Sequence, residues 1–257
     1  MTPLHLPHEI HGPVPLVMLH GQFDSGANFR TVAKRLAADR PVYCLDLRNH
    51  GSAPWGDEHT YPAMAADVVT WLDRMGLEKV DLLGHSMGGK AAMVVALQVL
   101  KRIRKLVLVD IAPVSYAHTL TGYTQAMLDV DLGTAKTRSE VDRSLAKTID
   151  EPVIRAFLLQ NLKRSDTGLY WRINLQALLE YGNAISAFPD FNGATYEGPS
   201  LFLHGDRSDY IQKRHTEAIR SLFPNTQLRE VADCDHWVHA EQPEAFLQAV
   251  SSFLDHP

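Results

Sequence analysis

The stretch LLGHSMGG, residues 82–89, decides the fold class of this 257-residue chain. It contains the pattern G-x-S-x-G, in which a serine occupies a strained turn between a strand and a helix. Val80 to Gly84 reads as the strand and Ser86 to about Val99 as the helix. Glycines before and after the serine let the neighbouring backbone come close. The stretch therefore predicts an α/β sheet with Ser86 exposed at a strand end as a nucleophile.

Strand-like apolar runs alternate with helical patterns on both sides of this turn. The runs are Val14 to His20, Pro41 to Asp46, Ile103 to Asp110, Pro199 to His204 and Thr226 to Val231. Helical patterns of about 10 to 16 residues between strands indicate right-handed βαβ units. We therefore expect a mostly parallel α/β sheet of about seven to eight strands, with helices on both faces.

The alternation stops between about Ala112 and Thr195. Helical patterns begin near Asp150 and Leu175 in this segment, and no strand pattern separates them. About 80 residues of helix inserted into an α/β alternation are typical of a cap laid over one edge of the sheet. We expect residues 1–111 and 196–257 to form the core and residues 112–195 to form an all-helical cap.

Composition and charge narrow the classes of partner. The chain has 25 Lys and Arg against 30 Asp and Glu, a net charge of -5, so it lacks the basic surface that nucleic acids or anionic lipids require. Its longest apolar run, Ala91 to Leu97, is too short to span a membrane. The start MTPLHLPHEI has no signal-peptide pattern. We expect a cytoplasmic monomer or small homo-oligomer that acts on a small molecule.

No cofactor or metal is indicated. Cys44 and Cys234 are the only cysteines and have no metal-ligand spacing, which suits a reducing compartment. His236 and His239 lie three residues apart, but there is no HExxH pattern and no cysteine partner. The nucleotide-binding patterns GxGxxG and the P-loop are absent as well.

A serine nucleophile needs a base to take its proton and an acid to orient that base. In this class of sheet the chain order is serine, acid, histidine, so the base is expected after the last strand. His236 lies there, between the strand that ends at Val231 and the final helix, and is the predicted base. His239 is the alternative.

The acid has three candidates. The turn after the penultimate strand commonly carries it three residues after a glycine, but Ser208 holds that position here, flanked by Asp206 and Asp209. Asp110 ends the strand that follows the nucleophile's helix, and that strand should pair beside the nucleophile's own. We favour Asp110, with Asp209 as the alternative acid and Asp206 third. A loop-capping role is the competing interpretation of Asp110.

The oxyanion hole needs two backbone N–H donors, each contributing about 3 kcal/mol to the transition state. One is expected from Met87, directly after the nucleophile, and the other from the loop after the first strand. In that loop Gln22 is preferred and Phe23 is the alternative. We expect the side chains of His20 and His85 to tie loops together rather than to titrate in catalysis.

Apolar cap helices are expected to roof the substrate pocket. The lining candidates are Phe23, Phe157, Leu158, Trp171, Leu175 and Trp237. For the cap residues among them, the competing interpretation is that they form an ordinary hydrophobic core within the cap.

Five stretches together resemble a known family. They are DLRNHGSA (46–53), GHSMGGKAAM (84–93), VDIAPV (109–114), WRINLQAL (171–178) and DHWVHAEQP (235–243). The chain resembles the α/β-hydrolase superfamily, and within it the YbfF-type bacterial esterases and their mitochondrial abhydrolase relatives. The resemblance implies a serine esterase of small acyl esters with a helical cap and no cofactor. It also favours Asp110, because this group resembles a variant whose acid follows the earlier strand.

Two departures from the family pattern matter. The loop HGQFDS, residues 20–25, stands where relatives tend to have HGLFGS, so Gln22 and Asp24 would make the pocket mouth more polar. The turn GDRSDYI adds two aspartates around Ser208. We expect a carboxylesterase that cleaves short to medium acyl esters through an acyl-enzyme. The alternatives are a C–C bond hydrolase, a lyase, a perhydrolase, or a ligand receptor that keeps the triad without using it.

Overall fold

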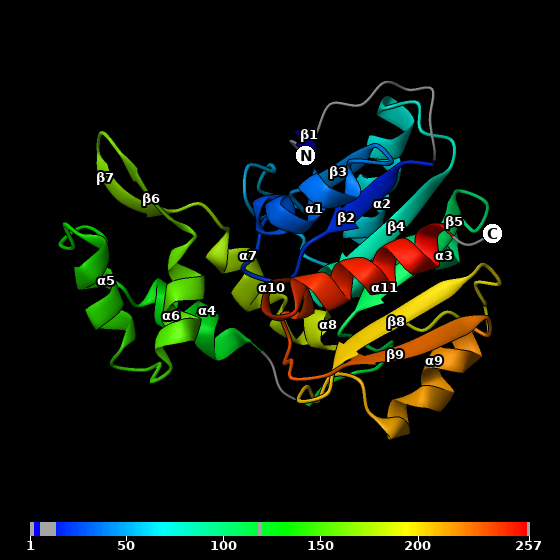
Figure 1. The fold of residues 1–257 in the computed structure, drawn as a ribbon. Helices are drawn as coiled ribbons and strands as arrows, with labels where there is room; N and C mark the ends of the chain where they lie inside the picture. Colours follow the sequence, from blue (N-terminus) through cyan, green and yellow to red (C-terminus); the bar gives the residue numbers. More distant parts are fainter. Residues whose placement is uncertain (1–2, 6–13, 118–119, 256–257) are drawn as a thin grey trace.

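The structure is a computed structural model that describes residues 3–5, 14–117 and 120–255. The first residues, on which the expectation about a signal peptide rests, lie mostly outside this range. A seven-stranded sheet, in the order β1-β3-β2-β4-β5-β8-β9, forms the centre of the molecule (Figure 1). Its strands are β1 (Pro3–His5), β2 (Leu16–Leu19), β3 (Val42–Leu45), β4 (Val80–His85), β5 (Ile103–Val109), β8 (Ser200–Gly205) and β9 (Thr226–Val231).

Six of these strands run parallel, and β1 pairs antiparallel with β3. This arrangement confirms the prediction of a mostly parallel sheet. The short β1 was missed because three residues are too few to show a strand pattern. Strands β2, β3 and β4 are buried along their whole length, as expected for a sheet covered on both faces.

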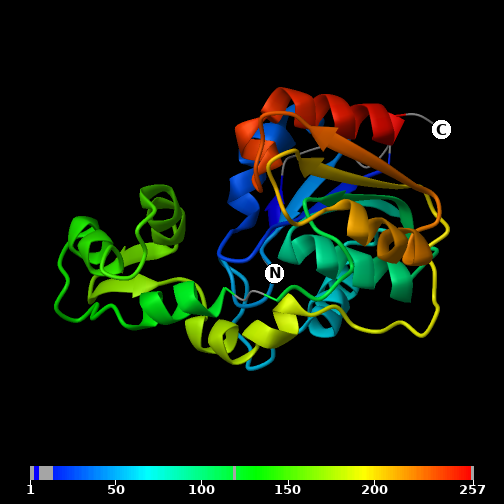
Figure 2. The ribbon, with the colours of Figure 1, turned by 90° about the horizontal axis from the view of Figure 1, so that it is seen from below.

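Two helix layers cover the sheet (Figure 2). Leu16 and Met18 of β2 pack on the side of α1 (Arg30–Leu36) and α11 (Pro243–Asp255). Val17 and Leu19 point the other way, because successive strand residues face opposite sides. They join the core under α2 (Tyr61–Arg74), α3 (Met87–Gln98) and α9 (Thr216–Leu222). Shorter helical segments are η1 (Gly26–Phe29), η2 (Lys213–His215) and α10 (Val238–Glu241).

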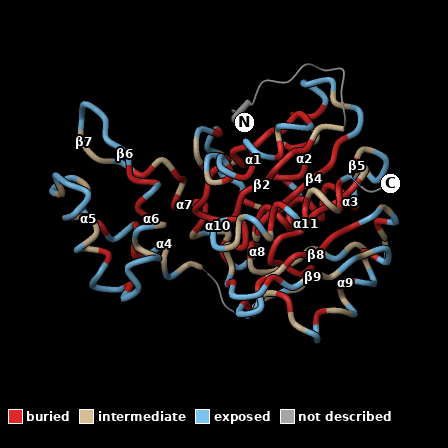
Figure 3. The backbone as a smooth tube through the Cα atoms, viewed as in Figure 1, coloured by how far each residue is buried: buried red, intermediate tan, exposed pale blue. Residues whose placement is uncertain are grey.

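Between β5 and β8 the chain forms an insert that extends away from the sheet (Figure 1). Its helices are α4 (Thr121–Leu128), α5 (Arg138–Leu145), α6 (Pro152–Leu159), α7 (Leu175–Glu180) and α8 (Gly182–Ser186). The insert has its own hydrophobic cluster, separate from the two clusters on the sheet faces. Figure 3 shows the corresponding buried positions within the insert, apart from the buried sheet.

The expectation that this segment is all-helical is wrong. It contains an antiparallel hairpin formed by β6 (Leu162–Ser165) and β7 (Gly168–Trp171). Only the paired residues Leu162 and Trp171 are buried, and the rest of the hairpin is partly or fully exposed. Four-residue strands with one buried position each are too short to show period-2 alternation, which explains why the sequence pattern did not reveal them.

The parallel topology decides where a site can form. The carboxyl ends of parallel strands lie at one edge of the sheet, and ligands of open α/β sheets bind in the crevice there. The segments that follow β2, β4, β5, β8 and β9 all leave from this edge. They carry the predicted oxyanion loop, nucleophile, acid candidates and base.

Candidate active site

Ser86 occupies a strained turn between β4 and α3. Its backbone angles are φ 52° and ψ -119°, a region that costs a non-glycine residue about 1–3 kcal/mol. The turn is also too tight for side chains on its flanks. A Cβ at Gly84 would lie 2.2 Å from the carbonyl oxygen of Gly88, and one at Gly88 would lie 2.3 Å from that of Leu19. This strained turn holds Ser86 at the edge of the sheet, directly before the amino end of the buried helix α3.

Asp110 and His236 meet beside this turn. Strand β5 pairs with β4 so that Val109 lies opposite His85, which puts Asp110 next to Ser86 at the sheet edge. His236, in the loop between β9 and α10, places its Nδ1 atom 2.7 Å from Oδ2 of Asp110. The Asp110 side chain is fully buried, whereas the His236 side chain is 18% exposed. The buried carboxylate of Asp110 thus contacts Nδ1 of the imidazole, while part of the His236 side chain remains accessible to solvent.

The structure brings Asp110, and neither of the other two aspartates, to His236. Asp209 is exposed and accepts a hydrogen bond from the Gln212 amide at 2.7 Å. Asp206 is exposed and accepts one from the backbone N–H of Cys234 at 3.1 Å. Ser208, at the position that commonly holds the acid, donates its hydroxyl to Oδ2 of Asp110 at 2.5 Å.

Sequence reasoning missed Tyr210. Its ring stacks on the imidazole of His236, with centroids 4.3 Å apart and an interplanar angle of 27°. Burial raises the pKa of the Tyr210 phenol to about 12, so the ring remains neutral against the imidazole. No local pattern marks this residue, because the contact depends on how the loop after β8 folds toward the loop after β9.

The alternative base, His239, lies deeper. It is 5% exposed, and its ring packs 4.9 Å from that of Phe29 and 4.9 Å from that of His85. Burial lowers the pKa of His239 to about 4.

His20 and His85 connect loops, as expected. His20 accepts a hydrogen bond from the Leu47 N–H at 3.0 Å and contacts the carbonyl of Gly21 at 2.8 Å. His85 places Nε2 3.0 Å from the backbone carbonyl oxygen of His236.

The backbone N–H groups of Met87 and of the loop after β2 are the candidates for an oxyanion hole. Helix α3 begins at Met87, and the first N–H groups of a helix have no acceptor within it. In the loop after β2, the N–H of Phe23 donates to Nε2 of His50 at 3.2 Å and is therefore engaged. This contact favours Gln22 over Phe23 as the second donor.

A cavity of about 280 Å³ lies over Ser86 and His236. Four of the predicted lining residues, Phe23, Phe157, Leu158 and Trp237, do line it. The other two predicted lining residues, Trp171 and Leu175, do not, and this part of the expectation is corrected. Both belong to the hydrophobic cluster of the insert, where the indole N–H of Trp171 donates to the carbonyl of Met127 at 3.0 Å. Further lining residues are Gly21, Gln22, Asp24, His85, Leu120, Tyr123, Ile154 and Tyr210.

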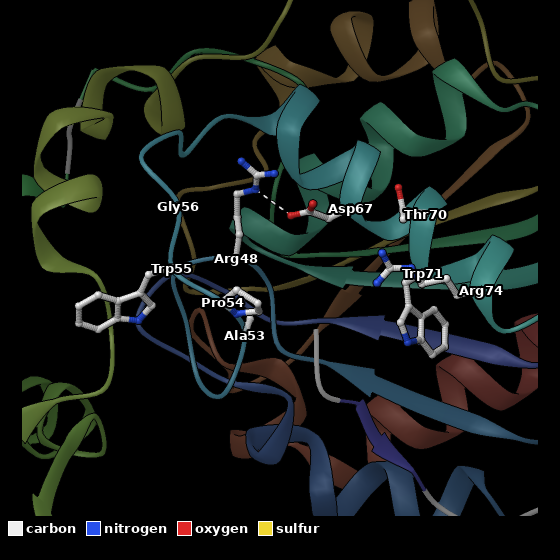
Figure 4. Close-up of a pocket in the computed structure, with 9 residues that line it drawn as sticks. All are labelled: Arg48, Ala53, Pro54, Trp55, Gly56, Asp67, Thr70, Trp71 and Arg74. Carbon is white, nitrogen blue, oxygen red and sulfur yellow. Dashed lines mark hydrogen bonds and ion pairs between the residues drawn. The ribbon is translucent and has the colours of Figure 1, made fainter.

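A second cavity, of about 290 Å³, is formed by the loop after β3 and helix α2 (Figure 4). Arg48 in its wall is paired with Asp67, with Nε 2.7 Å from Oδ2. None of the residues placed around Ser86 lines this cavity. Within the described residues, no three His, Cys, Asp or Glu side chains are grouped as metal ligands would be. No helix of the described parts is both long and apolar enough to cross a bilayer.

Comparison with known proteins identifies the fold family. Residues 14–243 match a family model described as alpha/beta hydrolase fold. The chain is 39% identical over 252 residues to the sn-1-specific diacylglycerol lipase ABHD11 of Xenopus laevis, covering 95% of this chain and 80% of that protein. It is 33% identical over 246 residues to the esterase YbfF of Escherichia coli K12, covering 95% of this chain and 94% of that one.

A solved structure titled a marine microorganism esterase superposes with a TM-score of 0.91 at 34% identity, over 95% of this chain and 96% of that one. The chain therefore belongs to the alpha/beta hydrolase fold family, as the sequence resemblance implied.

Proposed function

We propose that this chain is a serine carboxylesterase that hydrolyses short to medium acyl esters through an acyl-enzyme on Ser86. The observation that carries the proposal is the contact between His236 Nδ1 and Asp110 Oδ2, formed at the edge of a cavity that Ser86 also lines. Relatives with 33–39% identity over nearly the whole chain are named as an esterase and a lipase, which supports the same class of reaction.

The mechanism follows from the atoms that face one another. A carboxylate only accepts hydrogen bonds, so Nδ1 of His236 carries the proton shared with Asp110 and Nε2 keeps its lone pair. Nε2 removes the proton from the Ser86 hydroxyl as Oγ attacks the ester carbonyl carbon. Asp110 holds the tautomer and stabilises the imidazolium that forms.

The N–H groups of Gln22 and Met87 bind the oxyanion of the tetrahedral intermediate. The bond between the carbonyl carbon and the alcohol oxygen then breaks, and His236 gives its proton to the leaving alcohol. Water next attacks the acyl-enzyme while His236 takes its proton, and Ser86 is released with the carboxylic acid. Each step uses side chains, backbone N–H groups and water, so the proposal invokes no cofactor.

The insert supplies the apolar wall for the acyl chain. Tyr123 of α4 and Ile154, Phe157 and Leu158 of α6 line the cavity opposite the sheet edge. Phe157 packs against Trp237 of the base-bearing loop, with ring centroids 5.2 Å apart. We propose that residues 112–195 act as a cap in this sense. The two cysteines are free and buried, in keeping with the reducing cytoplasmic compartment that we propose.

The test is a series of p-nitrophenyl esters graded from acetate to dodecanoate. We expect turnover by the wild-type protein, with the best rates on short to medium chains, and a loss of at least about 10³-fold in kcat for Ser86→Ala. Ser221→Ala is the matched control, because that exposed hydroxyl donates to the carbonyl of Ala218 within α9. Full activity in Ser86→Ala would refute the proposal. A folded wild-type protein without turnover that retains a ligand tightly would instead favour a receptor.

A further inference from the structure

Two buried polar side chains line the largely apolar cavity near Ser86 without taking part in the proposed triad. Asp24 is 3% exposed and His85 is 1% exposed, and both line the cavity. Oδ2 of Asp24 lies 3.9 Å from Nδ1 of His85, too far for a direct hydrogen bond. Burying two polar groups in this way costs free energy unless a third group connects them.

His85 presents a bare acceptor to this gap. Its Nε2 lies 3.0 Å from the carbonyl oxygen of His236, which can only accept, so Nε2 carries the hydrogen. Burial, followed by the neighbouring His236 and His239, lowers the pKa of His85 well below its usual value, so the ring is neutral. Nδ1 therefore keeps its lone pair, and it has no hydrogen-bond partner among the residues that the structure describes.

Asp24 presents a donor to the same gap. Its Oδ1 accepts from the amide of Asn28, which also donates to Gln160 of the insert at 3.1 Å. Among the described residues, no Lys or Arg side chain lies within ion-pair distance of the Asp24 carboxyl. Burial raises the pKa of Asp24 to about 8, so the carboxyl is protonated at neutral pH. Its hydrogen is free to sit on Oδ2, because Oδ1 accepts from Asn28.

The gap adjoins the nucleophile. A Cβ on Gly21 would lie 3.0 Å from His85 Nδ1 and 3.3 Å from the Cβ of Ser86. The acceptor and the nucleophile therefore flank the same glycine of the oxyanion loop, and both belong to residues that line one cavity.

We propose that Asp24 and His85 form a hydroxyl-binding subsite, and that the preferred substrate is an ester carrying a free hydroxyl close to its ester bond. The proposal rests on the esterase function above. A hydroxyl oxygen can accept from Oδ2 of Asp24 and donate to Nδ1 of His85 at once, and a 3.9 Å separation leaves both atoms within hydrogen-bond distance of one oxygen. An ammonium group has no acceptor, and a carbonyl or ether oxygen has no donor, so neither satisfies both atoms.

The charged state of the subsite depends on few groups. The ring of His85 packs against His236 at 4.7 Å and His239 at 4.9 Å. The neutral amide of Asn28 donates to Asp24, and it also donates to the side-chain oxygen of Gln160. When Asp24 ionises above about pH 8, the gap holds two acceptors and no donor. The preference for a hydroxyl should therefore weaken as the pH rises through this range.

The experiment compares isosteric ester pairs in which a hydroxyl replaces a methyl group. The first pair, 2-hydroxyethyl butanoate and propyl butanoate, carries the hydroxyl on the alcohol. The second pair, ethyl 3-hydroxybutanoate and ethyl 3-methylbutanoate, carries it on the acid. At pH 6.5 we expect kcat/KM to favour the hydroxyl ester at least about tenfold in one pair, a factor worth about 1.4 kcal/mol, which also tells on which side of the ester bond the subsite lies.

Two variants test whether the side chain of Asp24 supplies the hydrogen-bond donor. Asp24→Leu removes the donor, and we expect the ratio within the pair to fall to about 2 or less. Asp24→Asn keeps an N–H donor but cannot ionise, so we expect it to retain the preference at pH 9, where the wild-type ratio declines. Asp209→Leu makes the matched change at an exposed aspartate outside the cavity and should leave the ratio unchanged.

Each result has one meaning. Wild-type ratios near 1 in both pairs, with turnover intact, would overturn the subsite and leave the esterase function standing. No turnover of any ester by the folded protein would overturn the function itself. A ratio that survives in Asp24→Leu would remove Asp24 from the proposal. If Asp24→Leu does not fold, the pH profiles of wild type and Asp24→Asn decide, and parallel profiles would contradict the role of Asp24.

Discussion

Ser208 donates its hydroxyl to Asp110 at 2.5 Å, through the same Oδ2 atom that lies 2.7 Å from His236 Nδ1. Ser208 stands three residues after Gly205, where this fold commonly carries its acid. The loop after β8 therefore contributes a hydrogen-bond donor to the candidate site. Its Ser208 orients the carboxylate of Asp110, and the loop does not supply the acid itself. The loops after β8 and β9 are thus connected through one atom, Oδ2 of Asp110.

Ser208 is therefore a positioning residue. We expect Ser208→Ala to lower kcat about 10- to 150-fold on a p-nitrophenyl ester, with KM nearly unchanged, because a lost hydrogen bond to a charged group is worth about 1.5–3 kcal/mol. Ser208→Thr, which keeps the hydroxyl, should restore part of the rate. Steady-state kinetics of both variants beside Ser221→Ala provide the check. Equal kcat in Ser208→Ala and wild type would show that the bond does not orient the acid.

The identity of the acid is open to a direct comparison of aspartates. Asp110→Asn should reduce kcat by about 10⁴-fold, because an amide beside Nδ1 favours the wrong imidazole tautomer. Asp209→Asn and Asp206→Asn change exposed side chains and should stay within about twofold of wild type. Circular dichroism confirms that each variant is folded. Should Asp209→Asn be crippled while Asp110→Asn is active, the acid has been misassigned.

The stacked ring of Tyr210 is expected to hold the imidazole of His236 in plane. Tyr210→Phe keeps the ring and should retain most of the activity. Tyr210→Ala should lower kcat about 2- to 12-fold, because an aromatic contact is worth about 0.5–1.5 kcal/mol beyond its buried area. Their kcat values on one ester provide the readout. Similar losses in the two variants would assign the effect to the phenol hydroxyl instead.

The raised pKa of Asp24 makes stability depend on pH. Its carboxyl has a pKa of about 8 in the folded protein, owing to burial, against 3.8 for the free group. Between these values the folded state binds a proton that the unfolded chain does not. The contribution to stability is therefore complete below pH 3.8 and is lost as the pH rises toward 8, by at most about 1.4 kcal/mol per unit.

Asp24→Asn has no such titration. The free energy of unfolding of wild type should fall between pH 5 and pH 8, and that of Asp24→Asn should not fall for this reason. Measured in urea, we expect the difference between variant and wild type to grow by about 2–4 kcal/mol in favour of Asp24→Asn over this range. A constant difference across this range would mean that Asp24 is already ionised at pH 5.

Much of the fold could be predicted from the sequence because buried parallel strands and their helices leave long periodic patterns. The stretch from Val80 to Val99 shows this best, since a strand, a glycine turn and a helix follow one another without interruption. The hairpin of β6 and β7 was missed because its strands bury one residue each.

The residues of the candidate site also fall into a group that could be predicted from the sequence and a group that could not. Chain order and strand pairing indicated which loops meet, and the structure brings Ser86, Asp110 and His236 to one edge. The lining residues depend on how the insert orients its helices, so Trp171 and Leu175 turned out to pack inside it. The stacking of Tyr210 and the gap between Asp24 and His85 arise from loops that fold back on one another, which no local pattern encodes.

The central claim is that Ser86 is the nucleophile, and covalent labelling tests it most directly. The protein is treated with a fluorophosphonate, which phosphonylates activated serines, and the modified peptide is identified by mass spectrometry. We expect one phosphonyl group per chain, located on Ser86, with no labelling of Ser86→Ala and slow labelling of Asp110→Asn. A label on another serine, or equal labelling of Ser86→Ala, would contradict the assignment of this turn as the reactive centre.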